Sequence, residues 1–172
     1  MRCQLKKNFD RTGVRSYIDH INEKPSVAEL QTPTNQKYHE SFPIKLHKIL
    51  GSELTKSGLI ISWLPHGRAF MIHDKARFEL EILGPLLEME PMKTFSKQLN
   101  IFGFRRLSRR SGCDTKGYYH ELFLSGREFL AYRIERRTKL KGLGYRKSLS
   151  MLTVDPDFYR LPPCFINCCS AK

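Results

Sequence analysis

The sequence lacks the features that would mark a membrane, secreted or metal-binding protein. No apolar run approaches the roughly 18 residues of a membrane-spanning helix, and the opening residues contain no stretch resembling a signal peptide. The five cysteines are odd in number and lie mostly near the ends, which does not make a disulfide framework. The run from Cys164 to Cys169 has no paired CxxC and no nearby histidine to complete a zinc site. We expect a soluble, intracellular protein that holds no metal and no cofactor.

Signs of catalysis are missing too. The six histidines are scattered over different predicted elements, and none pairs with a carboxylate and a nucleophile at a spacing typical of an active site. The segment from Gly112 to Gly117 lacks the GxxxxGKS or GxxxxGKT pattern of a phosphate-binding loop and indicates a turn. We therefore expect neither an enzyme nor a small-molecule substrate.

Acidic residues are scarce, because 17 Asp and Glu stand against 30 Lys and Arg, which gives a net charge of +13. The excess is concentrated between residues 91 and 150, which hold 15 basic and 4 acidic residues. Such concentration in one third of the chain indicates a single surface that faces an anionic partner. Charge alone does not choose between nucleic acid, membrane and acidic protein, but the missing apolar span argues against a membrane.

The predicted elements begin after a polar segment. Residues 1–40 have no hydrophobic period and predict a disordered N-terminal tail. Apolar residues then recur at helical spacing and predict a helix over 41–50, with Ser41 as its N-terminal cap. The residues of its buried face are Phe42, Leu46 and Ile49.

A hairpin and a second helix come next. The apolar runs 59–63 and 69–72 flank a Pro-His-Gly turn and predict two antiparallel strands. Asp74 then precedes a helical pattern over 75–83 and can cap it.

The third predicted helix, over 93–102, is amphipathic. At about 100° per residue, Phe95, Leu99 and Phe102 share one side of the helix. The opposite side carries only hydrogen-bond donors or cations, namely Lys93, Ser96, Lys97 and Asn100. Taken alone, this pattern is typical of an ordinary surface helix, so the next segment of the chain decides the interpretation.

That segment is a basic hairpin, with predicted strands over 104–107 and 118–122 around a loop rich in arginine. The order helix, hairpin, helix, turn, helix, hairpin is that of a winged helix-turn-helix. This is an α+β fold with three helices and a small antiparallel β-sheet, here over residues 41–137. In this fold the helix after the turn enters the major groove and the hairpin loop lies along phosphates.

The residues of these segments resemble the DNA-binding domain of heat shock transcription factors, in particular algal-type members. The run Phe95-Ser-Lys-Gln-Leu-Asn-Ile-Phe-Gly-Phe104 is similar to that family's recognition helix, whose pattern is close to Phe-x-Arg-Gln-Leu-Asn-x-Tyr-Gly-Phe. The opening helix and first hairpin are similar at Phe42-Pro-Ile-Lys-Leu46, Ile61-Ser-Trp63 and Phe70-Met-Ile-His73. The last strand and the turn beyond it are similar at Tyr118-Tyr-His-Glu-Leu-Phe-Leu-Ser-Gly-Arg127.

The resemblance implies a nuclear, sequence-specific transcription factor whose partner is double-stranded DNA with GAA-like sites. Lys97 stands where the family has the arginine that contacts guanine, and only a guanidinium offers a flat fork to both guanine acceptors. The base-contacting residues would be Lys97, Asn100 and Ser96. The phosphate contacts would come from Lys93, Arg105, Arg106, Arg109, Arg110, Lys116 and Arg127.

Several positions depart from the family pattern. Phe102 replaces a common tyrosine, Ser125 replaces a common arginine, and Gly84 stands at the usual proline position. Glu88 and Glu90 precede the recognition helix and would repel a duplex that they faced. An alternative therefore stays open: a diverged winged-helix module for protein interaction, with weak or no specific DNA binding. Binding of single strands or RNA would require exposed aromatics on a sheet face, which the sequence does not indicate.

Residues 138–172 predict a basic, largely irregular C-terminal tail. The basic run 135–147 could serve nuclear import, hold DNA loosely or simply be solvated. Family members ordinarily continue into heptads that trimerise them, but nothing here repeats at a and d over three heptads, so no trimerisation coiled coil is expected. Binding would then depend on neighbouring copies or on other heat shock factor-type proteins.

Overall fold

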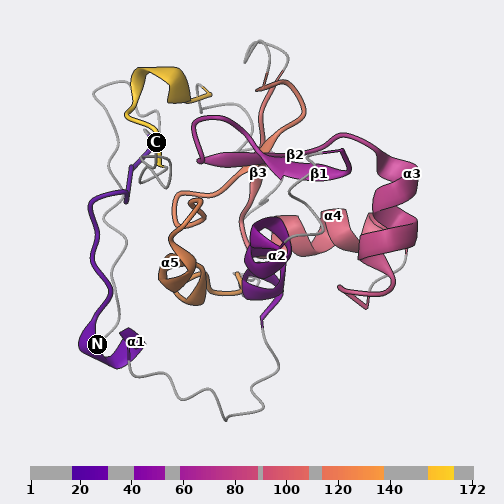
Figure 1. The fold of residues 1–172 in the computed structure, drawn as a ribbon, viewed down its shortest axis with the longest axis horizontal. Coiled ribbons are helices and arrows are strands. Elements are labelled where there is room, and N and C mark those ends of the chain that lie inside the picture. The colour runs from indigo at the N-terminus through magenta and orange to yellow at the C-terminus, as the bar shows by residue number, and fades with distance from the viewer. Residues whose placement is uncertain are drawn as a thin grey trace, which may run out of the picture.

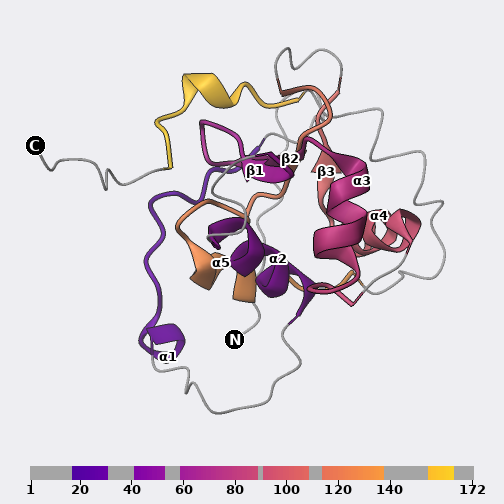
Figure 2. The ribbon, with the colours of Figure 1, turned by 45° about the vertical axis from the view of Figure 1, so that its right-hand side comes forward.

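The computed structural model describes residues 17–30, 41–52, 59–88, 91–108, 114–137 and 155–164. Its main elements follow the predicted order. The helices are α1 (Val27–Leu30), α2 (Phe42–Gly51), α3 (Lys75–Arg77), η2 (Phe78–Leu83), α4 (Met92–Ile101), α5 (Glu128–Tyr132) and the 3-10 turn η4 (Phe158–Arg160). The strands are β1 (Ile61–Trp63), β2 (Ala69–Ile72), β3 (Arg105–Arg106) and β4 (Tyr118–Tyr119). Two views show α2 and α5 beneath a small sheet, with α3 and α4 to one side (Figure 1, Figure 2).

The four strands form one antiparallel sheet in the order β1-β2-β4-β3. Ile61 lies opposite Ile72, and the turn between β1 and β2 includes Gly67 at a φ of 70°. Glycine suits this turn because a positive φ strains other residues. The predicted first hairpin is confirmed. The second hairpin also pairs as expected, although β3 and β4 are shorter than the predicted strands.

Helix α2 presents the predicted buried face, since Phe42, Leu46 and Ile49 are all buried. Ser41 is the N-cap residue, as predicted, but its side chain makes no capping hydrogen bond. The backbone carbonyl of Ser41 instead accepts from the amides of Ile44 and Lys45, at 2.9 and 3.1 Å. Pro43 is the second residue of the helix and has no amide hydrogen that the Ser41 hydroxyl could accept.

The second predicted helix divides into two parts. Asp74 caps α3 as predicted, because its carboxylate accepts from the amide of Arg77 at 3.1 Å. The chain then widens into the π-helical segment η2, where the amide of Gly84 donates to the carbonyl of Glu79, five residues back, at 3.4 Å. Helical period alone does not predict this widening, but Phe78 and Ile82 are buried, as their spacing of four residues indicates.

The main core lies between α2, α4 and the sheet. Phe95 on α4 is 0% exposed and packs edge-on against Phe42, at 5.6 Å, and Phe78, at 5.0 Å. Phe104 is buried as well, and its ring packs edge-on against those of Phe70 and Phe42. This packing orients α4, because its aromatic side is held by helices and strands on three sides.

Two segments outside the predicted domain also pack on it. Tyr17 and Ile21 contact the buried clusters, so the prediction of a disordered tail over 1–40 does not hold for residues 17–30. Near the other end of the chain, Phe158 is 1% exposed and Cys164 is buried. Residues 1–16, 31–40, 138–154 and 165–172 lie outside the described residues. These contacts went unpredicted because single apolar residues among polar ones give no period.

Two further findings concern the part of the chain that the structure describes. None of its helices combines the length and the apolar character that crossing a membrane requires. It also brings no three His, Cys, Asp or Glu side chains together in a cluster that could hold a metal ion.

Candidate nucleic-acid interface

Helix α4 separates apolar from polar side chains as the sequence predicts. Phe95 and Leu99 are 0% and 2% exposed, whereas Lys97 and Asn100 are exposed to solvent. Lys93 is exposed as well, and Ser96 lies half-buried at the edge of this polar face. The core therefore fixes one side of the helix and leaves a row of donors on the other.

The helix ends at a tight left-handed turn. Gly103 has a φ of 83°, and its amide donates to the carbonyl of Asn100 at 3.1 Å. The amide of Phe104 then donates to the carbonyl of Leu99 at 2.9 Å, which closes the end of the helix. The turn carries the chain directly into β3, so the hairpin stands immediately beside the polar face.

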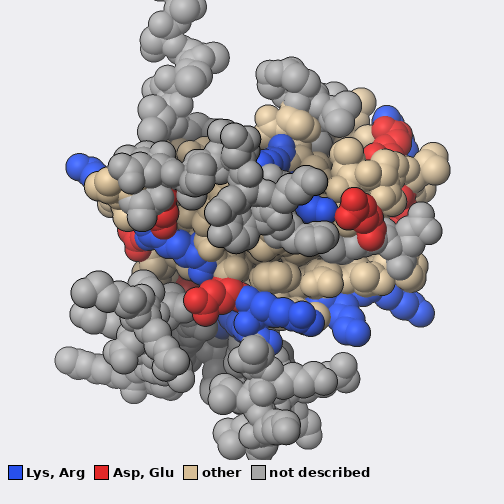
Figure 3. All heavy atoms as spheres, turned by 90° about the horizontal axis from the view of Figure 1, so that it is seen from below, with Lys and Arg blue, Asp and Glu red and all other residues tan. Residues whose placement is uncertain are grey.

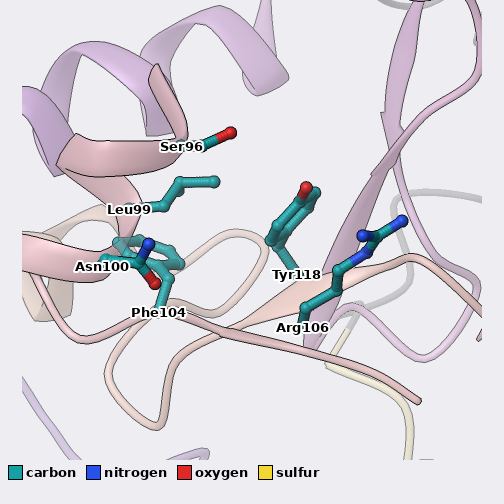
Figure 4. A pocket seen from close by; sticks show the side chains of 6 residues that line it. All are labelled: Ser96, Leu99, Asn100, Phe104, Arg106 and Tyr118. Carbon is teal, nitrogen blue, oxygen red and sulfur yellow. The ribbon is translucent and has the colours of Figure 1, made fainter. Parts of the chain in front are cut away.

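A hollow of about 210 Å³ lies between α4 and this hairpin. Figure 4 shows helix residues on one side of the hollow and Arg106 and Tyr118 on the other. The guanidinium of Arg106 lies 5.9 Å from the centre of the Tyr118 ring. The hollow has an apolar floor. Around this floor lie hydroxyl, amide and guanidinium groups that can donate to an anion or a base edge. The lining residues are Ser96, Leu99, Asn100, Phe104, Arg106 and Tyr118.

The hairpin divides the arginines that the sequence grouped together. Arg106 is exposed and lines the hollow, whereas Arg105 is half-buried and lies opposite Tyr119 in the sheet. Neighbouring residues of a strand point to opposite faces, so the two cannot share one surface. Burial raises the pKa of Tyr119, against the lowering effect of Arg105. Lys116 is exposed at the end of the loop, and Arg109 and Arg110 lie outside the described residues.

Arg127 lies in a different part of the molecule. It precedes α5, and both ribbon views place α2 between α5 and α4 (Figure 1, Figure 2). Its guanidinium donates to the backbone carbonyl of Glu23 at 3.1 Å, in the N-terminal segment. The structure therefore does not bring Arg127 to the polar face of α4.

The acidic turn before α4 is partly neutralised. Glu88 adopts a φ of 53°, and its carboxylate accepts from the ammonium of Lys45 at 3.2 Å. This ion pair is exposed, so it contributes little to stability, but it offsets the charge that would repel a polyanion. Glu90 lies outside the described residues.

One cation beside α4 went unpredicted as part of the site. The amide of Arg137 donates to the carbonyl of Ile101 at 2.9 Å, which ties the segment after α5 to the last turn of α4. The guanidinium of Arg137 lies directly over Gly103. A Cβ added at Gly103 would come within 2.4 Å of this side chain. The exposed Arg136 precedes it. The sequence signal for this cation was the basic run over 135–147. The contact between Arg137 and α4 joins residues far apart in sequence, which no local pattern indicates.

The electrostatic arrangement is visible from below the molecule. Figure 3 shows Lys and Arg side chains in a row along one edge of the face seen from below, with acidic side chains at one end of that row. Lys93 and Lys97 form no ion pair with an acidic residue in the described ranges. The cations of α4 therefore remain open to an anionic partner.

Three core helices, a four-stranded antiparallel sheet and a basic hairpin beside an amphipathic helix define a winged helix-turn-helix domain. Residues 42–137 match the family model described as HSF-type DNA-binding, which covers more than half of the chain. The chain therefore belongs to the heat shock factor family, and both the resemblance and the predicted fold are confirmed.

Several known proteins are similar to the chain. Heat shock factor protein 4 of Homo sapiens is 31% identical over 117 residues, which cover 64% of this chain and 23% of that protein. Heat stress transcription factor B-3 of Arabidopsis thaliana is 29% identical over 137 residues, which cover 80% of this chain and 50% of that protein. The chain thus spans between about a quarter and a half of the length of these curated relatives. The crystal structure of Chaetomium thermophilum Skn7 with HSE DNA is 26% identical, with a TM-score of 0.48, and the match covers 55% of this chain and 98% of that one.

Proposed function

We propose that this protein is a sequence-specific transcription factor of heat shock factor type that acts in the nucleus and not as an enzyme. Its polar α4 face would enter the major groove of GAA-like sites in double-stranded DNA. The observation that carries the proposal is the exposure of Lys97 and Asn100 on a helix whose opposite side is anchored in the core by Phe95 and Leu99. A rigid helix with outward donors is what base contacts require.

The proposed roles follow from position and exposure. Lys97 and Asn100 would contact base edges, with Ser96 beside them at the margin of the hollow. Lys93, Arg106 and Lys116 are exposed on α4 and the hairpin and would neutralise phosphates. Arg105 is half-buried and Arg127 donates to the carbonyl of Glu23, so we assign them smaller contributions.

A single module of this kind typically buries only about 600 to 1,000 Å² of protein surface on DNA. We therefore propose that the domain binds an isolated site weakly and gains affinity from neighbouring copies or other heat shock factor-type proteins. Adjacent sites on one duplex would then be occupied more tightly than the same sites far apart.

Selection of bound duplexes from a random pool tests the base-contacting role. The wild type should enrich GAA-like sites, and Lys97→Ala should lose the preference at the base that Lys97 contacts. Lys75→Ala is the matched control, because it removes the same charge from an exposed position on α3. If Lys97→Ala selects the same sequence with undiminished affinity, the assignment of Lys97 is wrong.

One observation favours the alternative of a protein interaction module. Leu80 is 77% exposed on η2 and Leu86 is 37% exposed just beyond it, and exposed apolar side chains of this size offer contacts to a protein partner. A titration of labelled duplexes at several salt concentrations separates the two functions. A steep salt dependence with preference for GAA-like sites supports the regulator, whereas flat and feeble binding favours the interaction module.

A further inference from the structure

The segment Asp155–Cys164 contacts both described ends of the loop between β3 and β4. At one end, the backbone amide of Ser108 donates to the carboxylate of Asp155 at 2.9 Å. At the other end, the hydroxyl of Tyr159 donates to the carboxylate of Asp114 at 3.0 Å. Asp114 is only 4% exposed, so its charge depends on these internal donors. One short segment thus bridges residues that enter and leave the same loop.

The same carboxylate is tied to the first hairpin. The backbone amide of Arg68 donates to Nδ1 of His66 at 3.0 Å, so the ring proton of the neutral histidine lies on Nε2. That nitrogen donates to Asp114 at 3.2 Å. The ring of His66 also lies 4.7 Å from the ring of Phe158 and 5.4 Å from that of Tyr159. The turn between β1 and β2 therefore forms a fixed base on which the segment and the loop end meet.

Apolar packing holds the segment in place. Phe158 is 1% exposed and belongs to a second buried cluster that lies apart from the main core. Its ring packs edge-on against Tyr17, at 5.0 Å, and Tyr119, at 5.4 Å. The backbone amide of Cys164 donates to the carbonyl of His66 at 3.2 Å, which secures the end of the segment. The other members of the cluster are Leu64, Ala69, Leu107 and Tyr119.

These partners lie outside the part of the chain that matches the family. The matched residues 42–137 contain His66 and Asp114, but their contacts in Asp155–Cys164 come from beyond that range. An isolated 42–137 fragment would expose the apolar cluster and leave the buried carboxylate of Asp114 with fewer donors. The packing of this chain therefore continues past the family domain.

We infer that Asp155–Cys164 is a positioning element that holds both ends of the β3–β4 loop and so sets the hairpin cations Arg106 and Lys116 against the DNA backbone. The DNA part of this inference rests on the proposed function, whereas the tethering of the loop ends does not. Asp155 and Tyr159 act as positioning residues, because they touch the loop ends and not the proposed ligand.

The tether is tested without DNA, by hydrogen exchange in the full chain. Asp155→Ala should raise the exchange rate of the Ser108 amide by about tenfold, because this amide loses its acceptor. Glu79→Ala is the control with the same change in charge, since Glu79 is exposed on η2 and should leave Ser108 unchanged. Equal exchange at Ser108 in the wild type and Asp155→Ala would overturn the tether.

The consequence for DNA is measured as the salt dependence of binding. Tyr159→Phe removes only a hydroxyl from an exposed ring, and Tyr132→Phe on α5 is its matched control. The double variant Asp155→Ala with Tyr159→Phe should lower the slope of log affinity against log salt by about 0.9, the loss of one phosphate contact. Glu79→Ala with Tyr132→Phe should keep the wild-type slope.

If the double variant raises the exchange rate of the Ser108 amide yet binds DNA with the wild-type salt slope, the positioning role is overturned. A wild type that binds every duplex feebly and without salt dependence would instead contradict the proposed function. The exchange of Ser108 would then still decide whether Asp155–Cys164 tethers the loop. The two failures are therefore distinguishable.

Discussion

The polar face of α4 and the turn between β1 and β2 use charge in opposite ways. On α4, Lys93 and Lys97 are exposed and contact no acidic side chain in the described ranges. At the turn, Arg68 is 0% exposed and its guanidinium donates to Asp19 at 2.7 Å. The cation at the turn is buried and paired within the fold, whereas the cations of α4 are exposed to solvent.

The N-terminal segment is also held by an arginine that pairs with acidic side chains. Arg133 on the α5 side donates to the carboxylates of Glu23 and Glu29, the latter at 2.7 Å. The hydrogen bond from Arg133 lowers the pKa of Glu29 to about 2. This cluster is partly exposed, so it orients the segment more than it stabilises the fold. The comparison therefore predicts that changes near the turn act on stability and changes on α4 act on DNA.

The largest expected effect comes from the turn. Arg68→Ala should lower the free energy of unfolding by about 3 kcal/mol, because it removes a buried side chain and strips Asp19 of its ion pair. Urea denaturation measures the loss. At low temperature the folded fraction should retain the DNA-site preference of the wild type. A loss of that preference in folded protein would show that the turn also governs DNA binding.

A smaller loss of stability is expected at the end of α4. Gly103→Ala should cost about 1 to 2 kcal/mol, because alanine is strained at a φ of 83°. The new methyl group would also displace the flexible guanidinium of Arg137. Thermal unfolding measures the cost, and Gly126→Ala, at a φ of 72° in open space, is the control for strain without that displacement. If only Gly103→Ala weakens DNA binding, Arg137 belongs to the interface.

Much of the fold could be predicted from the sequence, because hydrophobic period and turn residues are local signals. The amphipathic pattern located α4 to within one residue of its start, and the Pro-His-Gly turn located the first hairpin. The packing of Tyr17 and Phe158 could not be predicted, since isolated aromatics in polar segments have no period.

The candidate site was predicted unevenly for related reasons. The donors of α4 share a helix face, so their exposure follows from spacing alone. Arg105 and Arg106 were grouped by composition, although strand alternation separates them. Arg127 was expected beside α4 but is held at Glu23, whereas Arg137 was not expected there but is held at Ile101. Both positions depend on contacts with segments distant in sequence.

A gain of specificity should follow from restoring the family residue on α4. Lys97→Arg should improve discrimination against a wrong base by about 1 kcal/mol, because a guanidinium can donate to both guanine acceptors. Competition between matched and mismatched duplexes measures the change. Unfolding should be unaffected, since the side chain is exposed. An unchanged ratio of affinities would show that Lys97 does not contact that base.

The smallest expected effect concerns acid. Burial lowers the pKa of His47 below its ordinary value of 6.5, against the raising effect of its hydrogen bond to the Leu124 carbonyl. The folded state therefore favours the neutral ring, so stability is full above pH 6.5 and falls as the unfolded state takes up the proton. Denaturation curves at several pH values should show that the free energy of unfolding falls less steeply with acid in His47→Gln than in the wild type. Burial lowers the pKa of His66 as well, so some dependence should remain.

The most direct test of the division between the two regions is an amide spectrum of the full chain titrated with a GAA-containing duplex and then with a scrambled one. The specific duplex should shift the amides of Lys93 through Asn100 and of the β3–β4 hairpin, while those of His66, Gly67 and Arg68 stay in place. Shifts centred on the β1–β2 turn, or identical shifts with both duplexes, would contradict this division.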